Sequence, residues 1–165
     1  MAKSVDAEAL KALSHRKRVV FCPHWNVAGL VESFAPPPFV ERVDLRVTTS
    51  LTPFMAAAAC VVTDYSSIAF DAALIDKPLV YFQFADDGIY EGGHISAPGY
   101  FDFGRDGFGP VAATVDEAFD AIALAIDGRE DAKYSIRRRT AMPLSDGLCR
   151  QRTHDAMTAL LAGHS

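Results

Sequence analysis

Short apolar runs alternate with amphipathic segments along most of the chain. The runs of strand length are at residues 18–22, 43–48, 60–63, 78–84 and 109–113. Apolar positions at helical spacing predict helices over residues 5–15, 51–59, 67–76, 114–126, 130–141 and 147–162. Short strands that alternate with helices are typical of a parallel sheet covered on both faces. We therefore predict an α/β fold with a Rossmann-like parallel sheet.

Two segments modify this simple alternation. Residues 85–109 are rich in glycine and are predicted to form a long irregular loop, and loops of that length in compact domains are usually functional or mobile. Thr114 and Glu117 have the spacing of a capping box, which predicts a helix beginning at this point.

Ligands of parallel α/β sheets bind beyond the carboxyl ends of the strands, so the strand-to-helix turns are the first places to inspect. The most polar of these turns is Asp64-Tyr65-Ser66-Ser67. Two serine hydroxyls at a helix start, with its unpaired N–H groups, suit a phosphate. Asp71, one helical turn after Ser67, is placed to accept hydrogen bonds from a ribose. The simpler interpretation is that Asp64 or Ser66 only caps the helix.

Composition limits the classes of function. The chain has 165 residues and a formal net charge of -5, so no overall field favours nucleic acid or an anionic membrane. The three cysteines are dispersed, and no zinc-site spacing occurs, so no metal is expected and a reducing cytoplasmic compartment is the simplest expectation. Neither a signal peptide nor an apolar run of membrane-spanning length is evident.

Other phosphate and hydrolase motifs are missing from the sequence. No Walker A motif, G-x-G-x-x-G motif or G-x-S-x-G elbow occurs, which argues against ATP hydrolysis, dinucleotide binding and a serine hydrolase. The cluster Arg137-Arg138-Arg139 is interpreted as a solvated helix face, and contact with anionic lipid is the alternative.

The segment DYSSIAFDAALIDKPLVYF resembles the C-terminal half of the CDP-glycerol glycerophosphotransferases, the teichoic-acid primases and polymerases. The resemblance continues in order through GYFDF, GPV, the capped helix from Thr114 and the SDG before the last helix, and covers most of residues 18–162. It implies the second, donor-binding half of a two-domain GT-B fold. The implied donor is CDP-glycerol, from which glycerol phosphate is transferred to a polymer hydroxyl and CMP is released.

The resemblance also implies roles for individual residues. Ser66 and Ser67, with Asp64 beside them, would hold the donor phosphates, and Asp71 would hold the ribose. His24 would lie near the transferring phosphate, where positioning and charge stabilisation make up most of the catalysis. The family usually has Arg-x-His-Pro at this turn, whereas this chain has Cys-Pro-His-Trp, so the resemblance does not supply the arginine for one phosphate contact. His94, in the long loop, would reach a bound phosphate if that loop closes as a lid; otherwise it is a solvated surface histidine.

The family's whole enzyme also needs a first half, which binds the acceptor and supplies a general base. We predict that residues 1–165 form one nucleotide-donor-binding domain, with its core at about residues 18–162, and that the acceptor-binding half is absent. By itself such a chain should bind the donor without turning it over. The expected partners are the missing half and the acceptor polymer, no cofactor is expected to be tightly bound, and the expected location is the cytoplasm, at the inner face of the cell membrane.

Two other functions stay open at this point. One is a GT-B glycosyltransferase that uses a sugar nucleotide, because a helix-start phosphate site does not distinguish glycerol from a hexose. The other is a nucleotide-binding or protein-interaction module that kept the fold without transfer.

Overall fold

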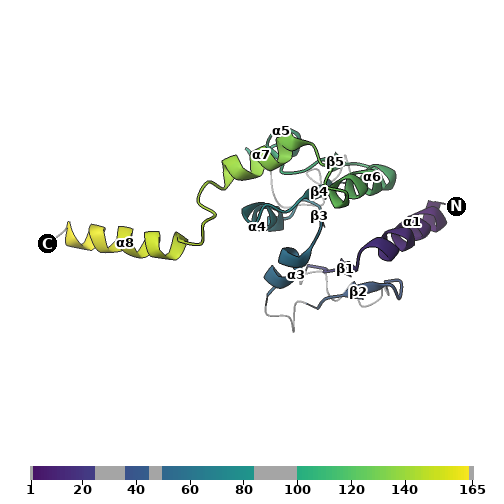
Figure 1. Ribbon diagram of the computed structural model, residues 1–165, viewed down its shortest axis with the longest axis horizontal. Coiled ribbons are helices and arrows are strands. Elements are labelled where there is room, and N and C mark those ends of the chain that lie inside the picture. Colours follow the sequence, from purple (N-terminus) through teal and green to yellow (C-terminus); the bar gives the residue numbers. More distant parts are fainter. Residues whose placement is uncertain (1, 25–35, 45–49, 84–99, 164–165) are drawn as a thin grey trace, which may run out of the picture. The chain divides into compact units, whose positions relative to one another are not determined.

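The computed structural model describes residues 2–24, 36–44, 50–83 and 100–163 (Figure 1). The chain divides into two compact units, Met1–Ala57 and Ala58–Ser165, which we call the N-terminal unit and the C-terminal unit. The expectation that residues 1–165 form one donor-binding domain stays a prediction.

The N-terminal unit contains two parallel strands and two helices. Its elements are α1 (Ala2–Arg16), β1 (Val19–Phe21), β2 (Val40–Arg42) and α3 (Thr52–Ala57). Val19 pairs with Val40 and Phe21 with Arg42, and the Val43 N–H donates to the Phe21 carbonyl at 2.9 Å just beyond the ladder.

The second strand lies earlier than residues 43–48, where the apolar run predicted it. The polar residue Glu41 lies inside this strand at an exposed position, where Arg18 Nε and Nη2 donate to its two carboxylate oxygens, each at 2.6 Å. Val43 is buried immediately after the strand, and residues 45–49 lie outside the described residues.

The C-terminal unit contains a parallel sheet in the order β3-β4-β5. The strands are β3 (Val61–Thr63), β4 (Leu79–Phe82) and β5 (Val111–Ala112), and the helices are α4 (Ile68–Leu74), α5 (Phe103–Asp106), α6 (Val115–Ile126), α7 (Ala132–Ala141) and α8 (Cys149–Ala162). Thr63 pairs with Tyr81 and Phe82 with Ala112, so the carboxyl ends of the three strands lie at one edge.

The central strand β4 is packed on both faces because its side chains alternate between two clusters. Leu79 and Tyr81 pack with three buried alanines of α4 and with Phe108. Val80 and Phe82 point the other way, where they pack with residues of β5 and α6, including Ala118. Helices therefore cover both faces of this sheet, and the prediction of a Rossmann-like parallel α/β fold is confirmed.

The Cys60 thiol belongs to the second of these clusters. Its burial, at the amino end of β3, raises the pKa of the thiol to about 12. A thiol with such a pKa remains protonated at neutral pH, so Cys60 acts here as a small apolar residue and not as a nucleophile.

The long loop predicted over residues 85–109 contains a short helix that its glycine content concealed. Asp102 caps α5 by accepting from the Arg105 N–H at 2.6 Å, and the Arg105 side chain donates to Asp106 and to the Tyr100 carbonyl. The Phe101 and Phe103 rings then pack against the first core cluster. Aromatic packing and a local cap thus order residues that have no helical periodicity.

The predicted capping box at the start of α6 is confirmed. Thr114 Oγ1 accepts from the Glu117 N–H at 3.3 Å, and Glu117 Oε2 accepts from the Thr114 N–H at 3.2 Å. Thr114→Ala removes the first bond, and we expect it to lower the free energy of unfolding by about 1 kcal/mol. Urea denaturation measures this. Thr114→Ser keeps the hydroxyl and should retain most of the stability; an equal loss in both variants would contradict the capping explanation.

Candidate functional site

The carboxyl edge of the β3-β4-β5 sheet carries the turn that the sequence singled out. Asp64 is the first residue after β3, and Ser67 immediately precedes α4. In the turn, Asp64 Oδ1 accepts from the Ser66 N–H at 3.1 Å, and Ser66 Oγ lies 3.4 Å from the Ile68 nitrogen as acceptor. The interpretation of Asp64 and Ser66 as capping residues therefore accounts for these two hydrogen bonds.

Ser67 differs from these two residues. It occupies the N-cap position of α4, with φ −64° and ψ −10°, yet its side chain makes no capping hydrogen bond, and the residue is exposed. Asp71 is also exposed, in the first turn of the same helix. A hydroxyl and a carboxylate on this short segment are thus accessible, and the helix cap does not explain Ser67.

The turn is held on the sheet by aromatic packing. The Tyr65 ring meets Phe103 edge to face at a centroid distance of 5.6 Å, and Phe70 of α4 lies 5.3 Å from Phe101. Phe103 in turn packs on Tyr81 of β4 at 5.1 Å. Each such pair adds about 0.5–1.5 kcal/mol beyond the burial of area, so the segment that begins at Phe101 fixes the start of α4.

Two predicted site residues do not belong to this turn. His24 is exposed and follows β1, directly after the buried Pro23, in the N-terminal unit. His94 lies outside the described residues. The structure therefore brings together Asp64, Ser66, Ser67 and Asp71 on one continuous segment, and the roles predicted for both histidines stay predictions.

The structure adds two residues that the sequence analysis did not select. Within the described parts of the chain, two buried side-chain nitrogen atoms have no hydrogen-bond partner, Arg42 Nε and Gln83 Nε2. Arg42 ends β2, and Gln83 is the first residue after β4. The sequence feature that could have identified such a residue is a polar side chain directly after an apolar strand. For Gln83, this strand is Leu79–Phe82.

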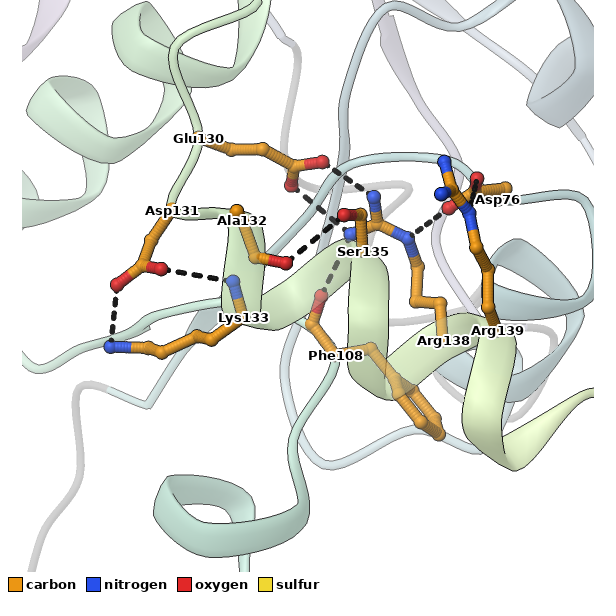
Figure 2. A network of polar contacts seen from close by, with 9 residues as sticks. All are labelled: Asp76, Phe108, Glu130, Asp131, Ala132, Lys133, Ser135, Arg138 and Arg139. Atoms are coloured by element: carbon orange, nitrogen blue, oxygen red, sulfur yellow. Dashed lines mark hydrogen bonds and ion pairs between the residues drawn. The ribbon is translucent and has the colours of Figure 1, made fainter.

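The cluster Arg137-Arg138-Arg139, predicted as a solvated helix face, is solvated only in part: Arg139 is exposed, whereas Arg138 is buried. Arg138 is 2% exposed; its guanidinium donates to Glu130, to Asp76 and to the Phe108 carbonyl (Figure 2). Arg139 also donates to Asp76, at 3.1 Å. Arg137 donates to the carbonyls of Gly104 and Gly107. The cluster joins α7 to the end of α4 and to the segment before β5. The sequence did not predict this role because the contacts are to residues distant in sequence.

Asp76 carries strain that this network offsets. It has a φ of +52°, a region that aspartate enters more readily than most residues but at some cost. Partial burial by itself raises the pKa of the Asp76 carboxyl, but the hydrogen bonds from Arg138 and Arg139 outweigh it and hold that pKa below its ordinary value. The carboxylate is therefore charged at neutral pH and pairs with both guanidinium groups.

A mostly apolar pocket of about 270 Å³ lies away from this edge. Its lining includes Leu79 and Pro110, which mark the amino ends of β4 and β5, together with Leu124 of α6 and Tyr134 of α7. No group of three His, Cys, Asp or Glu side chains suited to a metal occurs in the ranges that the structure describes. None of the helices in those ranges is long and apolar enough to cross a membrane.

A parallel sheet with helices on both faces is typical of a Rossmann-like half domain, and comparison with known proteins identifies its family. The family model described as CDP-Glycerol:Poly(glycerophosphate) glycerophosphotransferase matches residues 1–158, so the chain belongs to this family. The resemblance read from the sequence is thereby confirmed.

A curated relative supports the same assignment. The chain is 26% identical over 151 residues to the minor teichoic acid biosynthesis protein GgaB of Bacillus subtilis (strain 168). The matched region is 90% of this chain but 16% of that relative. The chain thus spans about one sixth of the length of the relative, and no solved structure matches it.

Proposed function

We propose that this chain is the donor-binding half of a glycerophosphotransferase that transfers glycerol phosphate from CDP-glycerol to a teichoic-acid-like polymer and releases CMP. The observation that carries the proposal is the family match over residues 1–158, in which the Asp64-Tyr65-Ser66-Ser67 turn lies at the carboxyl end of a parallel strand. That edge is where open α/β sheets bind nucleotides.

The turn offers uncharged hydrogen-bond donors for the diphosphate group of CDP-glycerol. The exposed Ser67 hydroxyl donates to a phosphate oxygen without adding a fixed charge. The Ser66 hydroxyl joins it, and Asp64 orders the turn through its bond to the Ser66 N–H. Asp71 accepts hydrogen bonds from the ribose hydroxyls.

The transfer step needs groups that this turn does not contain. The acceptor hydroxyl attacks the phosphorus next to glycerol, the bond from this phosphorus to the oxygen bridging it to CMP breaks, and CMP departs. We propose that His24 stabilises the charge on the transferring phosphate. The phosphate contact expected of His94, which lies outside the described residues, stays a prediction. The general base and the acceptor site belong to a first half outside residues 1–165, so this chain binds donor and leaves it intact. The polymer acceptor places the working enzyme at the inner face of the cell membrane.

Isothermal titration of the chain with CDP-glycerol, CMP and UDP-N-acetylglucosamine tests this proposal. We expect CDP-glycerol to bind in preference to the uridine sugar, and the double variant Ser66→Ala/Ser67→Ala to bind at least about tenfold more weakly, because hydrogen bonds to charged phosphate oxygens are lost.

Asp131→Ala is the matched control. It removes a comparable cap, the bond from the Lys133 N–H at the start of α7, and should leave the affinity unchanged. A preference for the uridine sugar would assign the chain to sugar-nucleotide glycosyltransferases. Absence of any nucleotide binding would favour an interaction module and overturn the proposal.

A further inference from the structure

The short helix α5 is held at its carboxyl end by a side chain from α7. With only four residues, α5 is too short to be stable without contacts from outside. Asp102 caps its amino end locally. At the other end, Arg137 Nη1 donates to the carbonyl oxygens of Gly104 and Gly107, at 3.1 and 3.0 Å. The last carbonyls of a helix need donors, and here α7 supplies them from about 30 residues further along the chain.

The first residue of α5, Phe103, connects this helix to the sheet and to the turn before α4. The centroid of its ring lies 5.1 Å from that of Tyr81 on β4 and 5.6 Å from that of Tyr65 in the turn. Just before α5, the Phe101 ring packs on Phe70 of α4 at 5.3 Å. The position of α5 therefore influences both the turn and the helix that follows it.

The turn before α4 has only modest bonds of its own. The Ser66 N–H donates to Asp64 Oδ1 at 3.1 Å, and Ser66 Oγ lies 3.4 Å from the nitrogen of the first residue of α4, near the upper limit for a hydrogen bond. The side chain of Ser67 makes no capping bond. The packing of Tyr65 on Phe103 therefore contributes to the conformation in which the two serines are presented.

We infer that Arg137 is a positioning residue of the donor site in the C-terminal unit. By fixing the end of α5, it holds Phe103 against Tyr65. The Tyr65 ring then fixes the backbone of the next two residues, Ser66 and Ser67, whose hydroxyls bind the donor phosphates. This inference rests on the proposed function and deepens it, since Arg137 acts through α5 without contacting the donor.

Arg137→Met tests the inference, because methionine has no donor but still packs on the Tyr134 ring, which the guanidinium approaches to 5.6 Å. Amide hydrogen exchange gives the first readout. We expect the N–H groups of Ser66 and Phe70, which bond within the turn, to exchange about 3- to 10-fold faster, while exchange in α6 stays unchanged. In titrations, the affinity for CDP-glycerol should fall by about 3- to 10-fold. A merely stabilising contact would not change the exchange of the turn alone.

Two further variants complete the experiment. Arg137→Lys keeps a positive charge and N–H donors and should recover most of the affinity. Arg139→Met removes a guanidinium from the same helix, but its bond is to Asp76, so it should leave both readouts unchanged. A loss of affinity in either variant equal to that in Arg137→Met would overturn the inference. Faster exchange throughout the C-terminal unit of Arg137→Met, or failure of this variant to fold, would also overturn it, because Arg137 would then stabilise the whole unit.

The proposed function and this inference fail in different ways. If the unmodified chain binds CDP-glycerol and Arg137→Met binds it equally well, the inference is wrong while the proposed function stands. If the unmodified chain binds neither CDP-glycerol nor CMP, both are wrong for this chain, even if the exchange of Ser66 is faster in Arg137→Met.

Discussion

Replacement of Arg138 by alanine is expected to lower the free energy of unfolding by about 3–5 kcal/mol, the range for removing one partner from a buried ion pair. The guanidinium of Arg138 is 2% exposed and donates to two carboxylates and to the Phe108 carbonyl (Figure 2). Without it, Glu130 and Asp76 lose their main counter-charge, the Phe108 carbonyl loses a donor, and a cavity opens beneath α7. Urea denaturation of the full chain measures the change.

Arg139→Ala is the matched control for this prediction. Arg139 bonds the same Asp76, but its side chain is 72% exposed, and an ion pair at such a position contributes about 0–1 kcal/mol. The two neighbouring arginines should therefore differ several-fold in their effect on stability. Similar losses in both variants would mean that the charge of the cluster, and not the burial of Arg138, determines its contribution.

Gly109→Ala is expected to have the second largest effect. A Cβ at residue 109 would lie 1.9 Å from the Leu79 carbonyl oxygen, because the chain entering β5 passes directly over the start of β4. Since the obstructing atom is backbone of the central strand, relief requires the β4–β5 pair to separate, and the cost should be about 3 kcal/mol or more. Thermal unfolding should show a clear decrease in melting temperature.

Gly128→Asn separates this steric effect from backbone preference. Gly128 has a φ of +67°, but no atom lies within 4 Å of a Cβ placed there, and asparagine tolerates this backbone region. We expect a change of less than about 1 kcal/mol. If Gly109→Ala proves as mild as Gly128→Asn, then β5 is not held against β4 as closely as the structure indicates.

Local patterns explain why the sequence predicted most elements well. The strands β3, β4 and β5 and the helices α4, α6 and α7 lie within the ranges expected from periodicity, and the capping box of α6 forms with both of its bonds. These features depend on residues within a few positions of one another. β2 was placed a few residues too late because the polar residues Glu41 and Arg42 interrupt its apolar pattern, and because its pairing with β1 joins residues distant in sequence.

The sequence by itself determined the parallel α/β class, the family and the Asp64-Tyr65-Ser66-Ser67 turn at a strand end. Only the tertiary structure decided that Arg138 is buried, because its partners Asp76 and Glu130 reach it from separate segments. It likewise decided that Gln83 retains an unmet donor, since hydrogen-bond satisfaction depends on every neighbour in space. Periodicity reports which face of an element is apolar, whereas burial of a charge or an amide is set by contacts between elements distant in sequence.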